Sequence, residues 1–450
     1  MAKRLTPSDA MFLYGESREV MMHVGGMLLF TPPPDAPPDH LRRLADEIRA
    51  GVPVHAPWNL RLRHPDFLRN PLQSWVEDEV DVEYHVRRTA LPSPGDEREL
   101  GIVVSRLHGH PIDLHRPPWE VHLIEGLEGN RFAMYVKVHH ALVDGYTAMR
   151  VLSTAMSTDA EERDRPLFFS IPRPPRGEGD AAAGVLFPEL LAIVREQYGA
   201  SKTVARALLR IAQGDRELVT PRQAPKCVLN ARISRSRRFA TQQLETARIK
   251  AVAKAAEGTV NDVLLGLCAT SLRRYLLERD ALPEAPLVAM LPVAVRTKDE
   301  EGGGNAVGAI LASLATDIED PKERLAAIVA STSSAKQQLQ GMSKAAILQY
   351  SALLLAPAML QMIPGAAGRL PPTFNVVISN VPGPEETRFF RGARLDASYP
   401  LSIPVHGQAL NITCNSYAGN VCFGFTGCRD TVPRLPRRRS RRGSGRVRSG

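Results

Sequence analysis

The sequence contains few cysteines, and none of them has metal-binding spacing. Five cysteines occur among 450 residues, at positions 227, 268, 414, 422 and 428, and no two form a CxxC motif. Because their number is odd, they cannot all pair within one chain. This use of cysteine excludes a disulfide-rich secreted domain and indicates a reducing compartment.

Segments able to enter or cross a membrane are also scarce. The first nine residues, from Met1 to Asp9, lack the apolar core of a signal peptide, so we expect a cytoplasmic protein. Ala345–Ile363 carries no charge and approaches spanning length. It contains Pro357 and several polar residues, and these favour a buried or surface-lying helix over a span.

Basic charge is nearly absent from the body of the chain, although the formal net charge is +9. Residues 433–450 contain eight arginines and no lysine, aspartate or glutamate, which leaves +1 for the other 432 residues. A charge block of this kind is typical of a solvated tail. A near-neutral body gives no indication of nucleic acid as a partner, and we expect none.

The length and composition predict two domains with a long connection between them. A chain of 450 residues exceeds the usual size of a single core. Residues 157–226 begin with a stretch rich in proline, arginine and acidic residues, followed by an amphipathic helix with a cationic row over Arg195–Arg210. We therefore divide the chain into residues 1–156, a linker and crossing helix at 157–226, a second domain at 227–432, and a basic tail at 433–450.

Both halves show mixed helix and strand patterns. Helices are predicted at His40–Arg49, Asp96–His108, Tyr146–Met156 and Val260–Tyr275, the last opened by Thr259 and Asp262 in an approximate capping box. Strands are predicted at Val121–Leu127, Arg131–Val138, Leu287–Val295, Val307–Thr316, Phe374–Val381, Ala409–Asn415 and Asn420–Phe425. The last two strands flank a tight turn and predict a hairpin.

One segment has the residue types for acid–base chemistry. His139 and His140 stand where a predicted strand meets a predicted helix, and Asp144-Gly145 follow four residues later. On a strand the two imidazoles point to opposite faces, so only one can serve a given channel. Imidazole, with a pKa near 6.5, suits removal of a hydroxyl proton at neutral pH. A carboxylate nearby can hold the loop, and a glycine leaves room for a close approach.

A structural role and a metal site are the two other interpretations of the His-His pair. Adjacent histidines are often structural. They lack the HxxxH or HxxH spacing of a helical metal site, and no further histidine or cysteine stands nearby, so the pair is a poor zinc site. The segment alone therefore leaves a catalytic and a structural role open.

The surrounding blocks give the segment a family context. His139-His140-Ala-Leu-Val-Asp144-Gly145 resembles the HHxxxDG motif of bacterial wax ester synthase/diacylglycerol acyltransferases, a branch of the CoA-dependent acyltransferase superfamily that also includes condensation domains. Blocks in the same order along nearly the whole chain are similar to that family: Leu5–Leu13, Pro111–Glu120, Asn261–Gly266, Asn375–Pro384 and His406–Thr413. In the second block Ile112 and Pro118 replace leucines of the family pattern.

The resemblance implies roles for individual residues. His140 would be the general base that deprotonates the acceptor hydroxyl, with His139 supporting the site and Gly145 leaving room for substrate. Asp144 would be structural and pair with an arginine that the sequence does not identify. Asn261 is a candidate for orienting or stabilising reacting groups, although helix capping also explains it. Trp119 is a candidate for the wall of the acyl tunnel, with a buried core position as the alternative.

The resemblance also implies the fold and the reaction. The fold would be two chloramphenicol-acetyltransferase-like mixed α/β domains with an active-site tunnel at their interface. The enzyme would esterify diacylglycerol with acyl-CoA as co-substrate and no other cofactor. Transfer to a long-chain fatty alcohol is the closest alternative, and a non-catalytic lipid-binding paralogue is an alternative of another class. The partner surface would be the cytoplasmic membrane face or a lipid inclusion, approached through Ala345–Ile363, Arg195–Arg210 and the tail.

Overall fold

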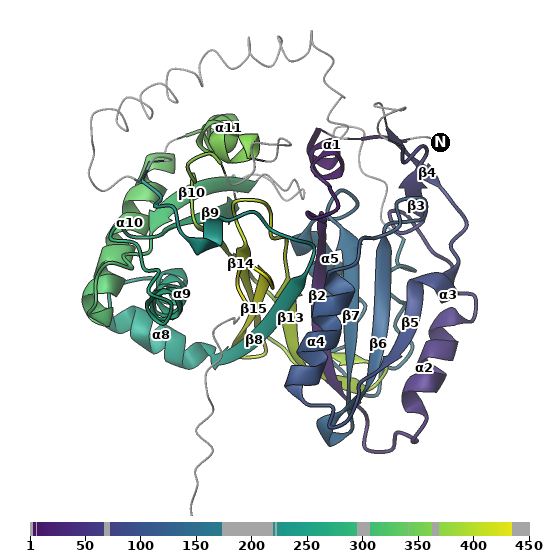
Figure 1. Cartoon of the computed structure of the whole chain (residues 1–450). Helices are drawn as coiled ribbons and strands as arrows, with labels where there is room; N and C mark the ends of the chain where they lie inside the picture. Colours follow the sequence, from purple (N-terminus) through teal and green to yellow (C-terminus); the bar gives the residue numbers. More distant parts are fainter. Residues whose placement is uncertain are drawn as a thin grey trace, which may run out of the picture.

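The protein is built as two mixed α/β halves that lie side by side (Figure 1). The computed structural model describes residues 3–5, 7–66, 73–172, 219–220, 223–294, 307–340, 342–361 and 369–433. Within them, each half contains a six-stranded sheet, and a three-stranded sheet lies near the N-terminus. The predicted cationic helix at 195–210 and the arginine-rich residues 434–450 lie outside the described residues.

The sheet of the first half places the predicted hairpin at its centre. Its strands, in spatial order, are β12 (Phe389–Phe390), β13 (Ala393–Leu401), β2 (His23–Thr31), β7 (Arg131–His139), β6 (Trp119–Leu127) and β5 (Val86–Ala90). All neighbours are antiparallel except β5 and β6. The turn between β6 and β7 uses Gly129 and Asn130 at positive φ, as the predicted Glu128–Asn130 turn requires.

Two strands of this sheet come from the second half of the sequence. β12 and β13 belong to residues 389–401, yet β13 pairs along β2 from Arg394 to Leu401. The predicted domain of residues 227–432 did not anticipate that two of its strands would join the sheet of the first half. β13 in turn lies against β15 (Asn420–Cys428), where a Cβ on Gly424 would stand 1.8 Å from the carbonyl oxygen of Pro400. The two sheets therefore approach each other at Gly424, where any side chain would collide with the backbone of β13.

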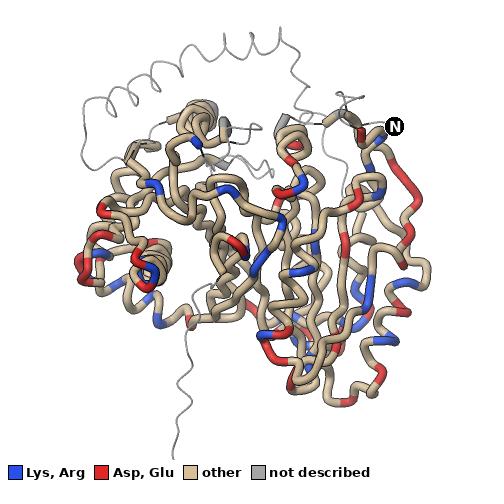
Figure 2. Tube along the Cα trace, viewed as in Figure 1, with Lys and Arg blue, Asp and Glu red and all other residues tan. Residues whose placement is uncertain are grey.

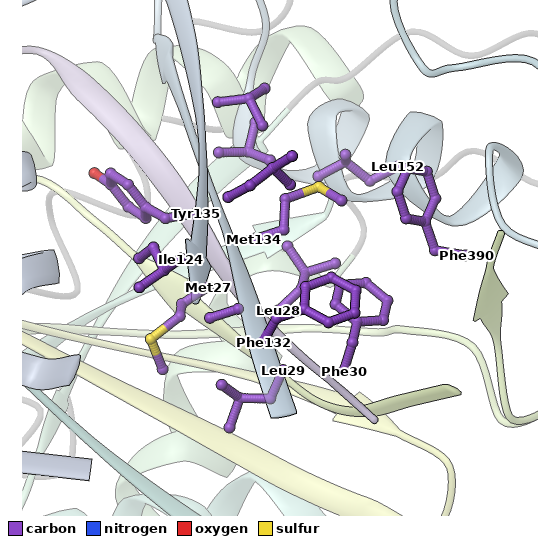
Figure 3. Packing of buried hydrophobic residues seen from close by; sticks show 14 of the residues in the cluster. Met27, Leu28, Leu29, Phe30, Ile124, Phe132, Met134, Tyr135, Leu152 and Phe390 are labelled. Carbon is purple, nitrogen blue, oxygen red and sulfur yellow. The ribbon is translucent and has the colours of Figure 1, made fainter. Parts of the chain in front are cut away.

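The two faces of the first sheet carry different helices. Tyr135 points to one face, where its hydroxyl hydrogen-bonds His108 of α4 (Glu97–His108). Met134 points to the other face and shares an apolar cluster with Leu152 of α5 (Gly145–Thr154) and Phe390 (Figure 3). α4 also touches the second half, because the Ser105 hydroxyl accepts a hydrogen bond from the Phe239 backbone on β8 (Arg237–Glu245).

The sheet of the second half has strands in the order β10, β9, β11, β14, β15 and β8. The strands not yet bounded are β9 (Val288–Ala294), β10 (Val307–Ser313), β11 (Val376–Val381) and β14 (Leu410–Tyr417), and the helices of this half are α8 (Thr246–Ala255), α9 (Val260–Leu277), α10 (Pro321–Leu339) and α11 (Lys344–Leu360). β14 and β15 form the predicted hairpin, closed between Tyr417 and Asn420. The predicted strands of this half are thus confirmed.

Several predicted helices are also confirmed. α9 begins with a capping box in which the Thr259 hydroxyl and the Asp262 carboxylate each accept from the other's backbone N–H. α4 is capped by Asp96, whose carboxylate accepts from the Glu99 N–H. α2 spans His40–Arg49 as expected and buries Leu41, Leu44, Ala45 and Ile48.

The N-terminal segment links the two halves. The small sheet contains β1 (Lys3–Arg4), β4 (Ser74–Glu77) and β3 (Leu60–Leu62), and α3 covers Val82–His85. α1 (Pro7–Tyr14) is followed by a loop whose Val20 and Met22 are buried in the core cluster of the second half. β2 then begins at His23 in the first sheet. The loop between α1 and β2 therefore runs along the junction between the halves.

Charged residues of both signs are distributed over both halves (Figure 2). α11 differs in composition from this pattern, because none of its residues after Lys344 is charged. It exposes Leu348 and Leu353 while burying Ala346, Tyr350 and Leu354. Across the described ranges, no helix is both long enough and apolar enough to cross a membrane.

Candidate active site

The His-His segment lies where the two halves meet. His139 is the last residue of β7, and the His140 backbone N–H donates to the Met22 carbonyl oxygen at 2.8 Å. Because the Met22 side chain belongs to the core of the second half, this bond ties the segment to the junction between the halves. Asp144 and Gly145 then open α5.

His139 is a fixed, buried connector. Its Nε2 lies 2.9 Å from Glu16 Oε2, and its Nδ1 accepts a hydrogen bond from the Ala141 backbone N–H at 3.1 Å. Since Nδ1 accepts a hydrogen bond, Nε2 is the nitrogen that donates its N–H to the Glu16 carboxylate. The same Glu16 oxygen accepts from the Met22 N–H at 3.1 Å. His139 therefore holds the loop between α1 and β2 and has no nitrogen left for a substrate.

His140 occupies a different environment. Its ring stacks on Phe12 of α1, with centroids 4.0 Å apart. Nδ1 is completely buried and makes no hydrogen bond of normal geometry within the described residues. Burial lowers the pKa of His140 to about 4, against the opposing effects of Asp144 and the residue's own backbone carbonyl. The ring is thus neutral at physiological pH, and Nε2 is the nitrogen available to a substrate.

Asp144 is the N-cap of α5. Its carboxylate accepts from the Thr147 backbone N–H and the Thr147 hydroxyl, each at 2.8 Å. This cap fixes the direction in which α5 leaves the His-His segment. The expected partner of Asp144 was an arginine, whereas the contact described here is with Thr147, which sequence reasoning did not single out.

Gly145 has open space above its Cα. A Cβ built there meets no described atom within 4 Å, and its φ is not in the left-handed region. Neither the backbone conformation nor a neighbouring protein atom therefore requires glycine. The space stays free next to the His-His segment, as a substrate would need.

Asn261 is not used to cap its helix. Thr259 and Asp262 make the capping box, while Asn261 Oδ1 accepts a hydrogen bond from Asn380 Nδ2 at 2.7 Å. Asn380 lies on β11, so the pair joins the start of α9 to the sheet of the second half. The bond leaves the amide donors of Asn261 available. No hydrogen bond between described residues connects Asn261 to His140.

Trp119 belongs to an enclosed aromatic cluster. It is fully buried, and its Nε1 donates to the Trp58 carbonyl at 2.7 Å. The ring stacks on His85 and Phe169, with centroid distances of 4.4 and 5.3 Å. These contacts favour a core position for Trp119 over a place on a tunnel wall.

A second polar group lies on the His139 side of the sheet. Lys137, which is 1% exposed, has its Nζ 3.0 Å from Glu120 Oε2, and the same oxygen is 3.3 Å from His122 Nε2. Burial raises the pKa of Glu120, but His122 and Lys137 outweigh it and hold the pKa at about 2. The three side chains border a cavity of about 460 Å³ whose lining does not include His140. This cavity is therefore separate from the candidate base.

The structure adds residues that the motifs did not reveal. Glu16 and Phe12 contact the two histidines from a segment more than 120 positions away, and Asn380 holds Asn261 across a similar separation. Neither Glu16 nor Phe12 shows a local pattern that marks it out. All five cysteines are free thiols. Within the described part of the chain, no three His, Cys, Asp or Glu side chains gather in a way that could hold a metal ion.

Comparison with known families matches nearly the whole chain. Residues 5–264 match the wax ester synthase/diacylglycerol acyltransferase catalytic domain, and residues 303–437 match the WS/DGAT C-terminal domain. A putative diacylglycerol O-acyltransferase of Mycobacterium tuberculosis is 51% identical, over 97% of this chain and 95% of that protein. The O-acyltransferase WSD of Acinetobacter baylyi is 40% identical, over 96% and 93%.

Solved structures give the same result. The wax ester synthase/diacylglycerol acyltransferase from Marinobacter aquaeolei VT8 superposes with a TM-score of 0.77 at 42% identity, covering 97% of this chain and 95% of that chain. The first condensation domain of the calcium-dependent antibiotic synthetase superposes with a TM-score of 0.57 at 15% identity, covering 96% and 92%. At that identity the second likeness concerns the fold alone.

Proposed function

The chain belongs to the wax ester synthase/diacylglycerol acyltransferase family, and on this premise we propose that it transfers the acyl group of an acyl-CoA to the hydroxyl of diacylglycerol. The products are triacylglycerol and free CoA, and no cofactor beyond the acyl-CoA takes part. The proposal is carried by His140, a neutral imidazole at the junction of the halves, together with the open space over Gly145, five residues further along the chain.

His140 acts as the general base. Its Nε2 takes the proton of the acceptor hydroxyl while that oxygen forms a bond to the thioester carbonyl carbon. When the tetrahedral intermediate collapses, the C–S bond breaks and the thiolate leaves with the proton returned by His140. Asp144 and the residue's own carbonyl oxygen both favour the protonated ring during the transfer, against the effect of burial on the pKa of His140. No acyl-enzyme is needed, because the thiolate is already a good leaving group.

Asn261 and Asp144 assist from the two sides of the site. Asn261 accepts from Asn380, which leaves its amide N–H groups to stabilise charge on the thioester oxygen. Asp144 acts indirectly: it caps α5 and thereby holds the segment that carries His140 in place.

Diacylglycerol is proposed as the acceptor because the relative at 51% identity is named a putative diacylglycerol O-acyltransferase. The Acinetobacter and Marinobacter relatives, whose names include WSD and wax ester synthase, favour a fatty alcohol as the second candidate. Purified protein incubated with labelled acyl-CoA and either diacylglycerol or hexadecanol, followed by separation of the lipids, tests both. Labelled triacylglycerol is expected, wax ester alone would select the second candidate, and no transfer to either alcohol overturns the proposal.

We also propose that the enzyme works at the cytoplasmic face of a membrane or on a lipid inclusion. Its acceptor dissolves in lipid, and the exposed Leu348 and Leu353 of α11 can bury apolar area there. The eight arginines after Pro433 add attraction to anionic headgroups, which is screened beyond about 8 Å at physiological salt.

Co-sedimentation with vesicles of anionic phospholipid tests this location. We expect binding that falls with added salt and is weakened by deleting residues 434–450. Leu353→Glu should weaken the part of the binding that salt does not remove. Equal binding by wild type and Leu353→Glu at high salt would contradict a role for α11.

A further inference from the structure

Lys137 is a buried lysine to which the proposed reaction gives no part. It lies on β7 two residues before His139, so the two side chains point to the same face of the sheet. Its side chain is 1% exposed. Lysines are almost never buried this completely unless their charge is paired, so this position calls for a physical reason.

The ammonium group of Lys137 has three acceptors. Nζ lies 3.0 Å from Glu120 Oε2 on β6, and it donates to the carbonyl oxygens of Leu107 at 3.3 Å and His110 at 3.2 Å. An ammonium group has three N–H donors, so all of them are used. Leu107 lies in the last turn of α4, and His110 follows that helix. Lys137 therefore ties the C-terminal end of α4 to the centre of the first sheet.

Residues 111–118, the connecting segment, link α4 to β6 and are held by β7 at both ends. At the start, Lys137 Nζ donates to the carbonyl oxygen of His110. At the end, the His139 backbone N–H donates to the Pro118 carbonyl oxygen at 2.9 Å. The two donors on β7 are two residues apart, so together they fix where the connecting segment crosses the sheet.

The middle of the connecting segment packs against the turn that contains His140. Leu114 joins a small apolar cluster with Ala141 and Leu142, which follow His140 in that turn, and with Leu13 of α1. A shift of the connecting segment would therefore be passed to the turn through this packing.

The start of the connecting segment borders a cavity. Pro111, Ile112 and Asp113 line the cavity of about 460 Å³ together with Lys137 and Glu120. The segment is thus incompletely packed on the sheet at this end. Hydrogen bonds must hold it there, and those of Lys137 are in place to do so.

We propose that Lys137 is a positioning residue for the general base. By holding the start of the connecting segment, it fixes the turn from which His140 faces the acceptor hydroxyl. Lys137 touches no substrate and acts through the His110 carbonyl and the packing of Leu114. The inference rests on the proposed function, because it presupposes that His140 is the base. The competing explanation is that Lys137 serves only to neutralise the buried Glu120.

A double variant separates these two roles. Lys137→Met alone leaves the Glu120 carboxylate buried without its cation and is expected to lower the Tm. In Lys137→Met/Glu120→Gln both charges of the pair are gone, so the Tm should return toward that of the wild type. Its kcat should still be about tenfold below the wild-type value, because the connecting segment has lost the ammonium donors and the base is displaced.

Two acceptors, hexadecanol and 2,2-difluorohexadecanol, distinguish a displaced base from a loss of folded enzyme. The fluorinated alcohol is more acidic, so its acylation depends less on the base. The ratio of kcat for the fluorinated alcohol to kcat for hexadecanol should therefore rise in the double variant, and rise further in His140→Ala. A smaller amount of folded enzyme lowers both rates by the same factor and leaves the ratio unchanged.

Arg88→Met/Glu125→Gln is the matched control. It removes a cation–carboxylate pair at 3.0 Å between β5 and β6, on more exposed side chains that are remote in sequence from the connecting segment. This variant should keep the wild-type kcat and the wild-type ratio.

The outcomes separate this inference from the proposed function. Wild-type kcat in Lys137→Met/Glu120→Gln would mean that Lys137 only neutralises Glu120, which overturns the inference. A lower kcat with an unchanged ratio overturns it as well, because the base would then be in place. If the double variant fails to fold, Lys137→Leu replaces Lys137→Met.

A wild type that acylates neither alcohol calls for a measurement without turnover. Hydrogen exchange of the backbone amides of residues 139–142, followed by mass spectrometry, then replaces kcat. Faster exchange in the double variant than in the wild type and the control supports the inference, and equal exchange overturns it.

Discussion

The ring of Phe12 lies flat against the ring of His140, with the two planes inclined by 21°. This contact removes water from one face of the imidazole. Since burial is the largest cause of the low pKa of His140, α1 controls the pH range in which the base is neutral. The N-terminal helix thus influences the acid–base chemistry although it carries no titratable group that reacts.

Replacing Phe12 should therefore move the pH profile. In Phe12→Ala the His140 ring is hydrated and its pKa rises from about 4 toward 6.5, so a larger fraction is protonated at pH 5–6. We expect the acidic limb of kcat/KM to shift to higher pH. Phe12→Leu keeps an apolar cover and should shift the limb less. An unchanged acidic limb in Phe12→Ala would show that the limb reports another group.

The two histidines should differ when each is replaced by alanine. His140→Ala should reduce kcat by about 10²–10⁴-fold, as for other positioned bases, and should fold normally because Nδ1 has no hydrogen bond to lose. His139→Ala should reduce kcat less but lower the Tm, because Glu16 loses its partner. Equal losses of kcat with equal Tm would mean that the roles are assigned wrongly.

The Glu16–His139 contact should appear as a coupling energy. Glu16→Ala and His139→Ala each break the same charge-assisted hydrogen bond, so the double variant should be less destabilised than the sum of the two by about 1.5–3 kcal/mol. Urea unfolding of the four proteins measures this. Additive losses would place the stabilisation in the Met22 N–H contact of Glu16 instead.

Two glycines give a matched pair of alanine variants. The Cβ of Gly145→Ala meets no described protein atom, so this variant should fold with wild-type Tm and lose activity only if substrate occupies that space. Gly383→Ala places its Cβ 2.1 Å from a backbone oxygen and should lower the Tm by forcing the loop away from β14. Wild-type kcat/KM in Gly145→Ala would show that substrate passes elsewhere.

The Glu120–Lys137 pair predicts a pH-dependent stability. The pKa of Glu120 is held at about 2 in the folded protein, below its ordinary value of 4.5. Its stabilising contribution is therefore present above pH 4.5 and is lost as the pH falls toward 2. The difference in unfolding free energy between wild type and Glu120→Gln should shrink over this window, with Glu125→Gln on the exposed part of β6 as the control. A constant difference would contradict the low pKa.

Elements with local signals could be predicted from the sequence, and those held by distant partners could not. α2, α4 and α9 were found from periodicity and caps, and the β6–β7 and β14–β15 hairpins from their turns. β2 was missed because Gly25 and Gly26 interrupt it and both of its faces are covered. β13 was missed because a register shift after Leu395 and a proline at position 400 hide its alternation.

The same distinction holds within the site. The family motif singled out four candidates, His139, His140, Asp144 and Gly145, which lie within seven consecutive residues. It could not identify Glu16, because a carboxylate that contacts His139 through space leaves no trace in the sequence around it. The sequence was equally uninformative about Asn261 and Asn415. Asn261 accepts a hydrogen bond from a distant strand, and Asn415 Oδ1 is buried without a partner among the described residues, and both facts depend on strands that only the fold brings together.

The passage of β13 into the first sheet has a consequence for synthesis on the ribosome. Until residue 401 has left the exit channel, β2 is an edge strand, and the side of its seven residues Gly25–Thr31 that β13 later covers has unpaired backbone groups. His108, which packs on one face of that sheet, also lacks its contact with the Ser402 carbonyl oxygen until then. A nascent chain that has completed its His-His segment must therefore synthesise some 260 further residues before this edge strand can pair. An unpaired edge strand is prone to aggregation, so binding by chaperones should be strongest in that interval.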